Sequence, residues 1–175
     1  MASIEALRDK VRDVPDFPSP GVLFRDLTPL LADPAAFAGC IDALASPWHA
    51  AGIEAVCGIE ARGFIFGAAL ARRLDAGFVP LRKPGKLPPP VVEVEYALEY
   101  GADRLQATAG ALQGARRVLL VDDVLATGGT LAAAHQLVGR LGAGVAGAAV
   151  VIEIEALAGR ARWPCDVPLH AVLHY

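Results

Sequence analysis

Residues 118–130 decide the fold, and they read Val118-Leu-Leu-Val-Asp-Asp-Val-Leu-Ala-Thr-Gly-Gly-Thr130. The apolar run from Val118 to Val121 is expected of a central parallel strand that is covered on both faces. An Ala- and Leu-rich pattern typical of a helix follows over 131–141. We therefore predict a strand, a loop and a helix in succession, with the loop at Ala126 to Thr130.

This loop has the composition of a phosphate site. The first N–H groups of a helix have no intrahelical acceptors, and together with the helix dipole they favour a bound dianion. Gly128 and Gly129 let the backbone approach a ligand closely, and the hydroxyls of Thr127 and Thr130 can donate hydrogen bonds. The segment has neither the G-x-x-x-x-G-K-[ST] pattern of nucleoside triphosphatases nor the G-x-G-x-x-G pattern of dehydrogenases.

Two carboxylates, Asp122 and Asp123, precede the loop. We place them at the end of a strand that finishes at Val121, where open α/β sheets bind their ligands. Carboxylates there can accept hydrogen bonds from sugar hydroxyls, so the segment predicts a site for ribose 5-phosphate. A solvated strand end followed by a simple turn is the alternative.

Two hydrophobic residues, two acids and an A-T-G-G-T-like loop resemble the signature of the phosphoribosyltransferase family. The resemblance implies an α/β fold of the phosphoribosyltransferase type, Rossmann-like, with a mainly parallel sheet flanked by helices. It also implies a single domain over 1–175, with an N-terminal arm at 1–33 that forms a hood over the base and a flexible lid at 83–106. The expected donor is 5-phosphoribosyl 1-diphosphate.

The bulk composition fits one domain of 175 residues without disulfides. A net charge of −3 offers no general attraction to nucleic acid or to anionic lipid, so we expect neither as a partner. Cys40, Cys57 and Cys165 lack metal-type spacing, and we expect each to be reduced and buried. The charged N-terminus lacks the apolar core of a signal peptide, and no uncharged stretch is long enough to span a membrane, so we expect a cytoplasmic protein.

Hydrophobic periodicity gives the order of the elements. We predict helices over 3–11, 34–44, 64–74 and 131–141, and strands over 53–59, 79–82, 118–121, 145–154 and 167–173. Asp33 is the expected N-cap of the second helix, with Pro34 at its first position. Strands that alternate with helices indicate a mainly parallel sheet. Residues 83–106, which are rich in Pro and Gly, are expected to form a hairpin or lid.

A second strand-loop-helix junction lies at Gly58-Ile-Glu-Ala-Arg-Gly63. Glu60, Ala61 and Arg62 match the family's pyrophosphate loop, and this resemblance implies that they bind the donor's diphosphate. The guanidinium of Arg62 can form charge-assisted hydrogen bonds to such an anion, and backbone N–H groups complete the nest. An ordinary turn with an exposed arginine is the alternative.

Leu81-Arg-Lys-Pro-Gly-Lys-Leu87 gathers three cations shortly after a strand. Such a run is usually solvated, but Arg82, Lys83 and Lys86 lie where the family keeps residues that neutralise the diphosphate. In relatives this region reaches toward a neighbouring subunit, and the resemblance therefore implies a homodimer.

Two further motifs narrow the resemblance to the branch of the family that uses adenine. In Phe17-Pro-Ser-Pro-Gly-Val-Leu-Phe-Arg-Asp26 the resemblance places Leu23, Phe24 and Arg25 over the base, with the Phe24 ring stacked on the purine. In Leu98-Glu-Tyr-Gly101 it makes Glu99 the general acid/base, with Tyr100 beside it. Without the resemblance, Phe24 would be a core residue and the second motif the end of a hairpin strand.

The implied reaction transfers the phosphoribosyl group from 5-phosphoribosyl 1-diphosphate to adenine, giving AMP and diphosphate in purine salvage. The implied cofactor is Mg²⁺, held mainly through the substrate because the sequence shows no dedicated ligand set. Two alternatives stay open at this point. The base could be hypoxanthine, guanine, xanthine or orotate, or the chain could be a regulator that binds the donor without catalysis.

Overall fold

The computed structural model describes residues 3–98 and 101–175. It divides into two compact units, Met1–Ala43 and Leu44–Tyr175. In these described ranges, no helix combines the length and the apolar character needed to cross a bilayer. The single domain expected over 1–175 stays a prediction.

The first unit contains a hairpin and short helices. Its elements are α1 (Ile4–Arg8), β1 (Arg12–Pro15), β2 (Leu23–Asp26), α2 (Thr28–Ala32) and most of α3 (Pro34–Ala45). The helix predicted over 3–11 was too long, because Arg12–Pro15 pairs antiparallel with Leu23–Asp26 and draws the chain into a strand. The Asp33 side chain accepts hydrogen bonds from the N–H groups of Ala35 (3.0 Å) and Ala36 (3.1 Å), which confirms the predicted N-cap of α3.

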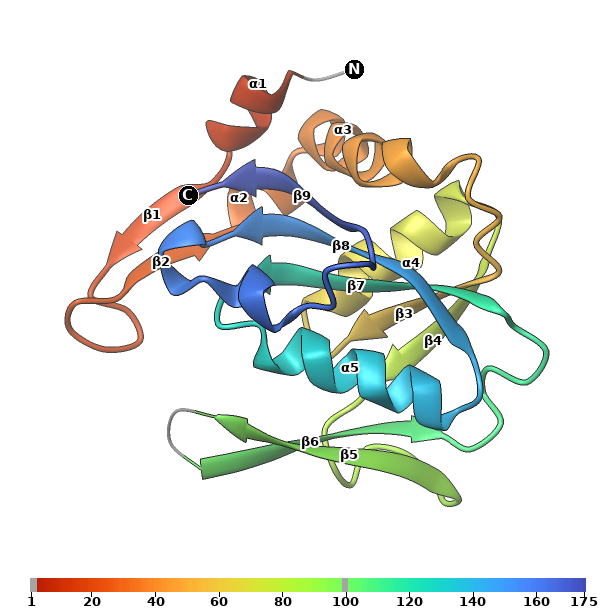
Figure 1. The fold of residues 1–175 in the computed structure, drawn as a ribbon. Coiled ribbons are helices and arrows are strands. Elements are labelled where there is room, and N and C mark those ends of the chain that lie inside the picture. The colour runs from red at the N-terminus through yellow and green to blue at the C-terminus, as the bar shows by residue number, and fades with distance from the viewer. Residues whose placement is uncertain (1–2, 99–100) are drawn as a thin grey trace. The chain divides into compact units, whose positions relative to one another are not determined.

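A five-stranded parallel sheet forms the centre of the second unit (Figure 1). Its strands lie in the order β4 (Gly77–Leu81), β3 (Ala55–Ile59), β7 (Arg117–Leu125), β8 (Gly144–Glu153) and β9 (Leu169–His174). The helices α4 (Gly63–Arg73) and α5 (Gly129–Arg140) cover opposite faces of this sheet. Short 3-10 helices also belong to this unit, namely η1 (Ser46–Trp48), η2 (Glu155–Leu157) and η3 (Gly159–Arg162). The predicted mainly parallel sheet flanked by helices is confirmed.

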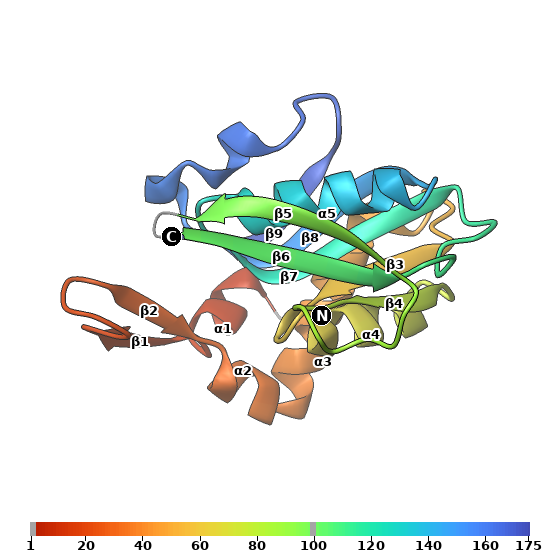
Figure 2. The same cartoon turned by 90° about the horizontal axis from the view of Figure 1, so that it is seen from below.

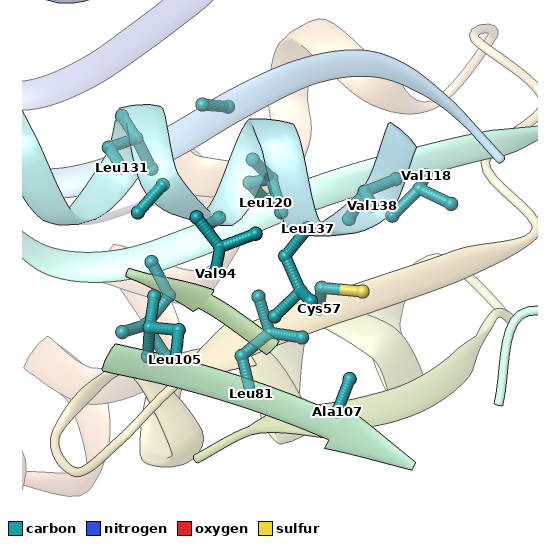
Figure 3. Packing of buried hydrophobic residues seen from close by; sticks show 14 of the residues in the cluster. Cys57, Leu81, Val94, Leu105, Ala107, Val118, Leu120, Leu131, Leu137 and Val138 are labelled. Atoms are coloured by element: carbon teal, nitrogen blue, oxygen red, sulfur yellow. The ribbon is translucent and has the colours of Figure 1, made fainter. Parts of the chain in front are cut away.

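The strands β5 (Val91–Leu98) and β6 (Gly101–Thr108) form the predicted antiparallel hairpin. The hairpin lies along α5, and Gln106 of β6 pairs with Arg82, the residue after β4 (Figures 1 and 2). Val94 and Leu105 are buried there in one cluster with Leu120 of the sheet and Leu137 of α5 (Figure 3). The stem of the hairpin is therefore part of the hydrophobic core, and a lid movement of 83–106 stays a prediction.

Strand β7 continues to Leu125, so the predicted strand end at Val121 was wrong. Main-chain pairing with β8 continues past the acids, with Asp122 opposite Val150 and Leu125 opposite Glu153. The partner strand rather than the local polarity sets this end, because carboxylates do not interrupt a backbone ladder. The helix α5 begins at Gly129, earlier than predicted, because Gly128 turns the chain with φ +80° at the N-cap.

The cysteines do not share one environment. Cys40 and Cys57 are buried, and burial raises the pKa of each thiol to about 12. Cys165 is exposed, so the prediction of burial was wrong for this residue. It lies in the connection between η3 and β9, outside both strands and helices.

Candidate active site

The predicted phosphate loop surrounds an open pocket at the carboxyl end of β7. The pocket lies between the last residues of β7 and the start of α5, with one residue from β8. Its lining comprises Asp122, Val124, Leu125, Ala126, Thr127, Gly128, Gly129, Thr130, Leu131 and Val150. The structure thus brings together all the predicted ribose and phosphate residues except Asp123.

The backbone of the predicted phosphate loop packs against the first residue of η3, Gly159. A Cβ built on Gly128 would lie 2.2 Å from the Gly159 carbonyl oxygen, and one on Gly159 would lie 2.1 Å from the Ala126 carbonyl oxygen. The two backbones therefore touch directly. Arg160 holds this segment, since its guanidinium binds the buried Glu153 carboxylate and the Leu169 carbonyl. Sequence reasoning missed Gly159, because no motif marks a glycine that acts through a distant loop.

The two acids of β7 have different surroundings, as alternation along a strand requires. Asp122 faces the pocket, whereas Asp123 is 6% exposed and forms an ion pair with Arg62 of the predicted diphosphate loop. Burial and the neighbouring Asp123 charge raise the pKa of Asp122 well above its usual range. Gly63 lets the start of α4 lie close to the end of β7, since a Cβ there would lie 2.9 Å from Asp122 Oδ1.

Glu60 organises the cations of the predicted diphosphate site. Its carboxylate accepts hydrogen bonds from Arg82 Nε (3.3 Å) and Nη2 (3.1 Å), and from the Lys83 backbone N–H (2.8 Å). The hydrogen bond from Arg82 lowers the pKa of Glu60. The cis peptide bond between Glu60 and Ala61 lies in this loop. Glu60 thus faces cations, so among the predicted diphosphate residues its side chain has a supporting position.

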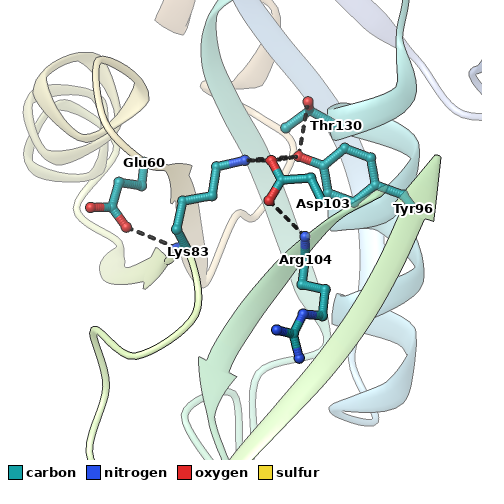
Figure 4. A network of polar contacts seen from close by, with 6 residues as sticks. All are labelled: Glu60, Lys83, Tyr96, Asp103, Arg104 and Thr130. Atoms are coloured by element: carbon teal, nitrogen blue, oxygen red, sulfur yellow. Dashed lines mark hydrogen bonds and ion pairs between the residues drawn. The ribbon is translucent and has the colours of Figure 1, made fainter. Parts of the chain in front are cut away.

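Lys83 and Tyr96 connect the hairpin with the predicted diphosphate loop at Glu60 and with the predicted phosphate loop at Thr130 (Figure 4). Its ammonium donates to the Tyr96 hydroxyl (2.9 Å) and pairs with the Asp103 carboxylate. The Tyr96 hydroxyl in turn donates to Asp103 (3.0 Å) and accepts from Thr130 Oγ1 at 3.4 Å. Sequence reasoning did not select Tyr96 or Asp103 for the site, because their facing positions depend on the register of the hairpin.

Lys86 is exposed, and its carbonyl accepts a hydrogen bond from Arg82 Nη1 at 3.2 Å. The predicted base residues lie in the first unit, on β2. Leu23 is exposed, the Phe24 ring meets the Phe17 ring edge-on at 5.2 Å, and Arg25 pairs with Asp13. The predicted catalytic residues Glu99 and Tyr100 lie outside the described residues.

Comparison with known proteins supports the family resemblance of the sequence. A family model described as "Phosphoribosyl transferase domain" matches residues 28–167. An adenine phosphoribosyltransferase of Xanthomonas axonopodis pv. citri (strain 306) is 56% identical over 95% of this chain and 90% of its own length.

Solved structures agree in fold. The crystal structure of adenine phosphoribosyltransferase from Rhodothermus marinus DSM 4252 superposes with a TM-score of 0.93, at 48% identity over 98% of both chains. The Saccharomyces cerevisiae adenine phosphoribosyltransferase, crystallised with an imino-altritol bisphosphate and adenine, gives a TM-score of 0.91 at 37% identity, covering 97% of this chain and 98% of that one. The chain therefore belongs to the phosphoribosyltransferase family and, within it, to the adenine phosphoribosyltransferases.

Proposed function

We propose that this chain transfers the phosphoribosyl group of 5-phosphoribosyl 1-diphosphate to adenine, giving AMP and diphosphate, as a step of purine salvage. The observation that carries the proposal is the position of the phosphate pocket. It shares the carboxyl edge of one sheet with an acid pair and with three cations, Arg62, Arg82 and Lys83. The names of the relatives support adenine as the base.

The donor's parts match this arrangement. Backbone N–H groups and hydroxyls from Ala126 to Thr130 would bind the 5-phosphate, and the carboxylates of Asp122 and Asp123 would orient the ribose hydroxyls. The backbone of Ala61 and the side chains of Arg62, Arg82, Lys83 and Lys86 would hold the diphosphate. The bond between ribose C1′ and the diphosphate oxygen breaks as adenine N9 bonds to C1′. A transition state with oxocarbenium character needs positioning and electrostatics rather than a protein nucleophile.

Mg²⁺ is the cofactor that this chemistry calls for. In the described ranges, no three Asp, Glu, His or Cys side chains are grouped so that they could enclose a metal ion. The Asp123 carboxylate is engaged by Arg62, and Asp122 borders the pocket, so the site fits an ion that is held mainly through donor oxygens and water. Bound there, Mg²⁺ would neutralise charge on the diphosphate.

The residues that cover adenine and the residue that accepts its proton are proposed from the family resemblance. Leu23, Phe24 and Arg25 would cover adenine, with an aromatic face available at Phe24. Glu99, beside Tyr100, would take the proton that adenine N9 loses when the new bond forms. A homodimer is proposed on the same ground.

The test is incubation of the purified protein with Mg²⁺, 5-phosphoribosyl 1-diphosphate and one base per reaction, followed by chromatography of the nucleotides. AMP from adenine alone is the expected result. A nucleotide from hypoxanthine, guanine, xanthine or orotate instead would refute the assignment of the base. Donor binding without any product would identify a regulator.

A further inference from the structure

The ammonium of Lys83 is neutralised by a carboxylate from another part of the chain. Lys83 follows β4, whereas Asp103 and Tyr96 lie on the hairpin strands β6 and β5. Two of the three N–H donors of the ammonium are therefore occupied by hairpin side chains. The Lys83 and Asp103 side chains are 35% and 28% exposed, so an anion from solvent can reach the pair.

Asp103 differs from the other acids that pair with site cations. Asp123 belongs to the acid pair of β7. Glu60 belongs to the predicted diphosphate loop, where its carboxylate accepts the Lys83 backbone N–H. Asp103 belongs to neither anion loop. It is held by the Tyr96 hydroxyl at 3.0 Å, and the same hydroxyl accepts a hydrogen bond from Thr130 of the phosphate loop. The hairpin therefore places a negative charge next to Lys83, one of the cations that we propose bind the diphosphate.

The consequence for an incoming anion follows from charge. A diphosphate that approaches Lys83 gains the attraction of the ammonium and meets the repulsion of the Asp103 carboxylate at nearly the same place. Such a pair binds a polyanion more weakly than a lone lysine would, and it also releases it more readily.

We propose that Asp103 is the internal counter-ion of Lys83 and sets the affinity of the site for diphosphate, both as part of the donor and as the free product. This inference rests on the proposed function. Asp103 is a positioning residue that acts through Lys83, and the hydroxyl of Tyr96 keeps its carboxylate in place.

The decisive experiment removes each partner of the ion pair in turn and measures the Kd of Mg²⁺-diphosphate by calorimetry. Asp103→Asn should lower the Kd at least threefold and lower the KM for the donor, whereas Lys83→Met should raise the Kd at least tenfold. Both substitutions remove the same ion pair, so both should lower the melting temperature slightly. A pair with a purely structural role would move both Kd values in the same direction or leave both unchanged, and either result would overturn the proposal.

Arg104→Gln is the matched control, because it removes the 3.1 Å ion pair with Glu93 that links the same two strands. It should leave the Kd for Mg²⁺-diphosphate unchanged. Asp103→Thr, which suits a strand position, replaces Asp103→Asn if that variant folds poorly, and the same fall in Kd is expected.

AMP formation by the unaltered protein tests the proposed reaction separately from the counter-ion role of Asp103. If the unaltered protein makes AMP while neither Asp103 variant binds diphosphate more tightly, the counter-ion role is refuted and the proposed function stands. If it makes no AMP from adenine but the two Kd values move in opposite directions, the counter-ion role stands and the proposed reaction is refuted. An unaltered protein that makes no AMP and binds no diphosphate would refute both.

Discussion

Asp122 is a carboxyl group in surroundings that oppose its ionisation. Burial and the adjacent Asp123 both raise its pKa, and the Asp123 backbone N–H, at 2.9 Å from Oδ1, offsets this only in part. Such a position weakens the fold and is expected where a carboxylate serves a ligand. The hydroxyls of a bound ribose would supply the hydrogen bonds that the free site lacks.

Asp122→Asn should therefore raise stability and lower activity. The amide keeps an acceptor at Oδ1 and removes the charge, so we expect about 0.5–2 kcal/mol of added stability. We also expect a loss of kcat/KM greater than about tenfold, or about 1.4 kcal/mol of transition-state stabilisation. Thermal denaturation and initial rates measure the two effects, and a less stable variant would contradict the electrostatic argument.

The pH dependence of the same variant has a definite sign. A carboxyl whose pKa is raised on folding contributes stability below its unfolded pKa, about 3.9, and loses that contribution as the pH rises through the folded value. The stability advantage of Asp122→Asn should therefore be absent below about pH 4 and grow as the pH rises. Melting curves from pH 3.5 to 8 test this, and an advantage that shrinks with rising pH would refute the assigned cause.

Gly159→Ala should damage the phosphate loop without touching the substrate. The added Cβ would collide with the Ala126 carbonyl, which is backbone and cannot rotate away. We expect the KM for the donor to rise at least about fivefold, since a shift of this kind misplaces the N–H groups that we propose bind the phosphate. Steady-state kinetics with varied donor measure the effect.

Gly139→Ala is the matched control for Gly159→Ala. Gly139 lies in α5 with no atom within 4 Å of a built Cβ. Alanine there should add about 0.5–1 kcal/mol of stability and leave the KM unchanged. A rise in KM for both variants would show that glycine replacement in general, rather than the Ala126 contact, is responsible.

At the scale of elements, α5 contacts both the parallel sheet and the antiparallel β5–β6 hairpin of the second unit. Its N-terminus follows the predicted phosphate loop, and its length packs against both the sheet and the β5–β6 hairpin (Figure 3). The hairpin contributes Val94, Leu105 and Ala107 to that core, all nearly or completely buried. A hairpin anchored in this way holds Tyr96 and Asp103 at a defined distance from both anion loops.

Leu105→Ala measures how firmly the hairpin is anchored. Leu105 is 0% exposed, so truncation should cost about 2–5 kcal/mol in the free energy of unfolding. Urea denaturation with Arg104→Gln as the surface control gives the value. A cost below about 1 kcal/mol would show that the stem of the hairpin separates readily from α5, as a lid that moves as a whole requires.

At the scale of the whole molecule, the donor should stabilise the fold because its site exists only in the folded chain. The pocket, Arg62 and Lys83 come from segments far apart in the sequence. A ligand at about 100 times its Kd adds about 2.7 kcal/mol of stability, which corresponds to roughly 5–10 °C in melting temperature at this chain length.

Thermal denaturation with Mg²⁺ and 5-phosphoribosyl 1-diphosphate tests this linkage. Ribose 5-phosphate should give a smaller rise, because it lacks the diphosphate that the three cations would hold. Equal rises with the two compounds would argue against a diphosphate site at Arg62, Arg82 and Lys83.

The sequence by itself determined the order of the sheet strands and of α3, α4 and α5, the N-cap at Asp33 and the position of the loop between β7 and α5. These features depend on hydrophobic periodicity, side-chain capping and glycine, all of which act over a few neighbouring residues. The family signature rests on the same local patterns. They do not report which residues a strand or a side chain will meet.

Only the tertiary structure decided the end of β7, the exposure of Cys165 and the partner of each charged side chain. The pairs Arg62 with Asp123, Lys83 with Asp103, and Arg160 with Glu153 depend on strand register and on the stacking of layers. The contact of Gly159 with the phosphate loop has the same origin. Such contacts join residues that are distant along the chain, and they are selected by packing and by the need to pair buried charges.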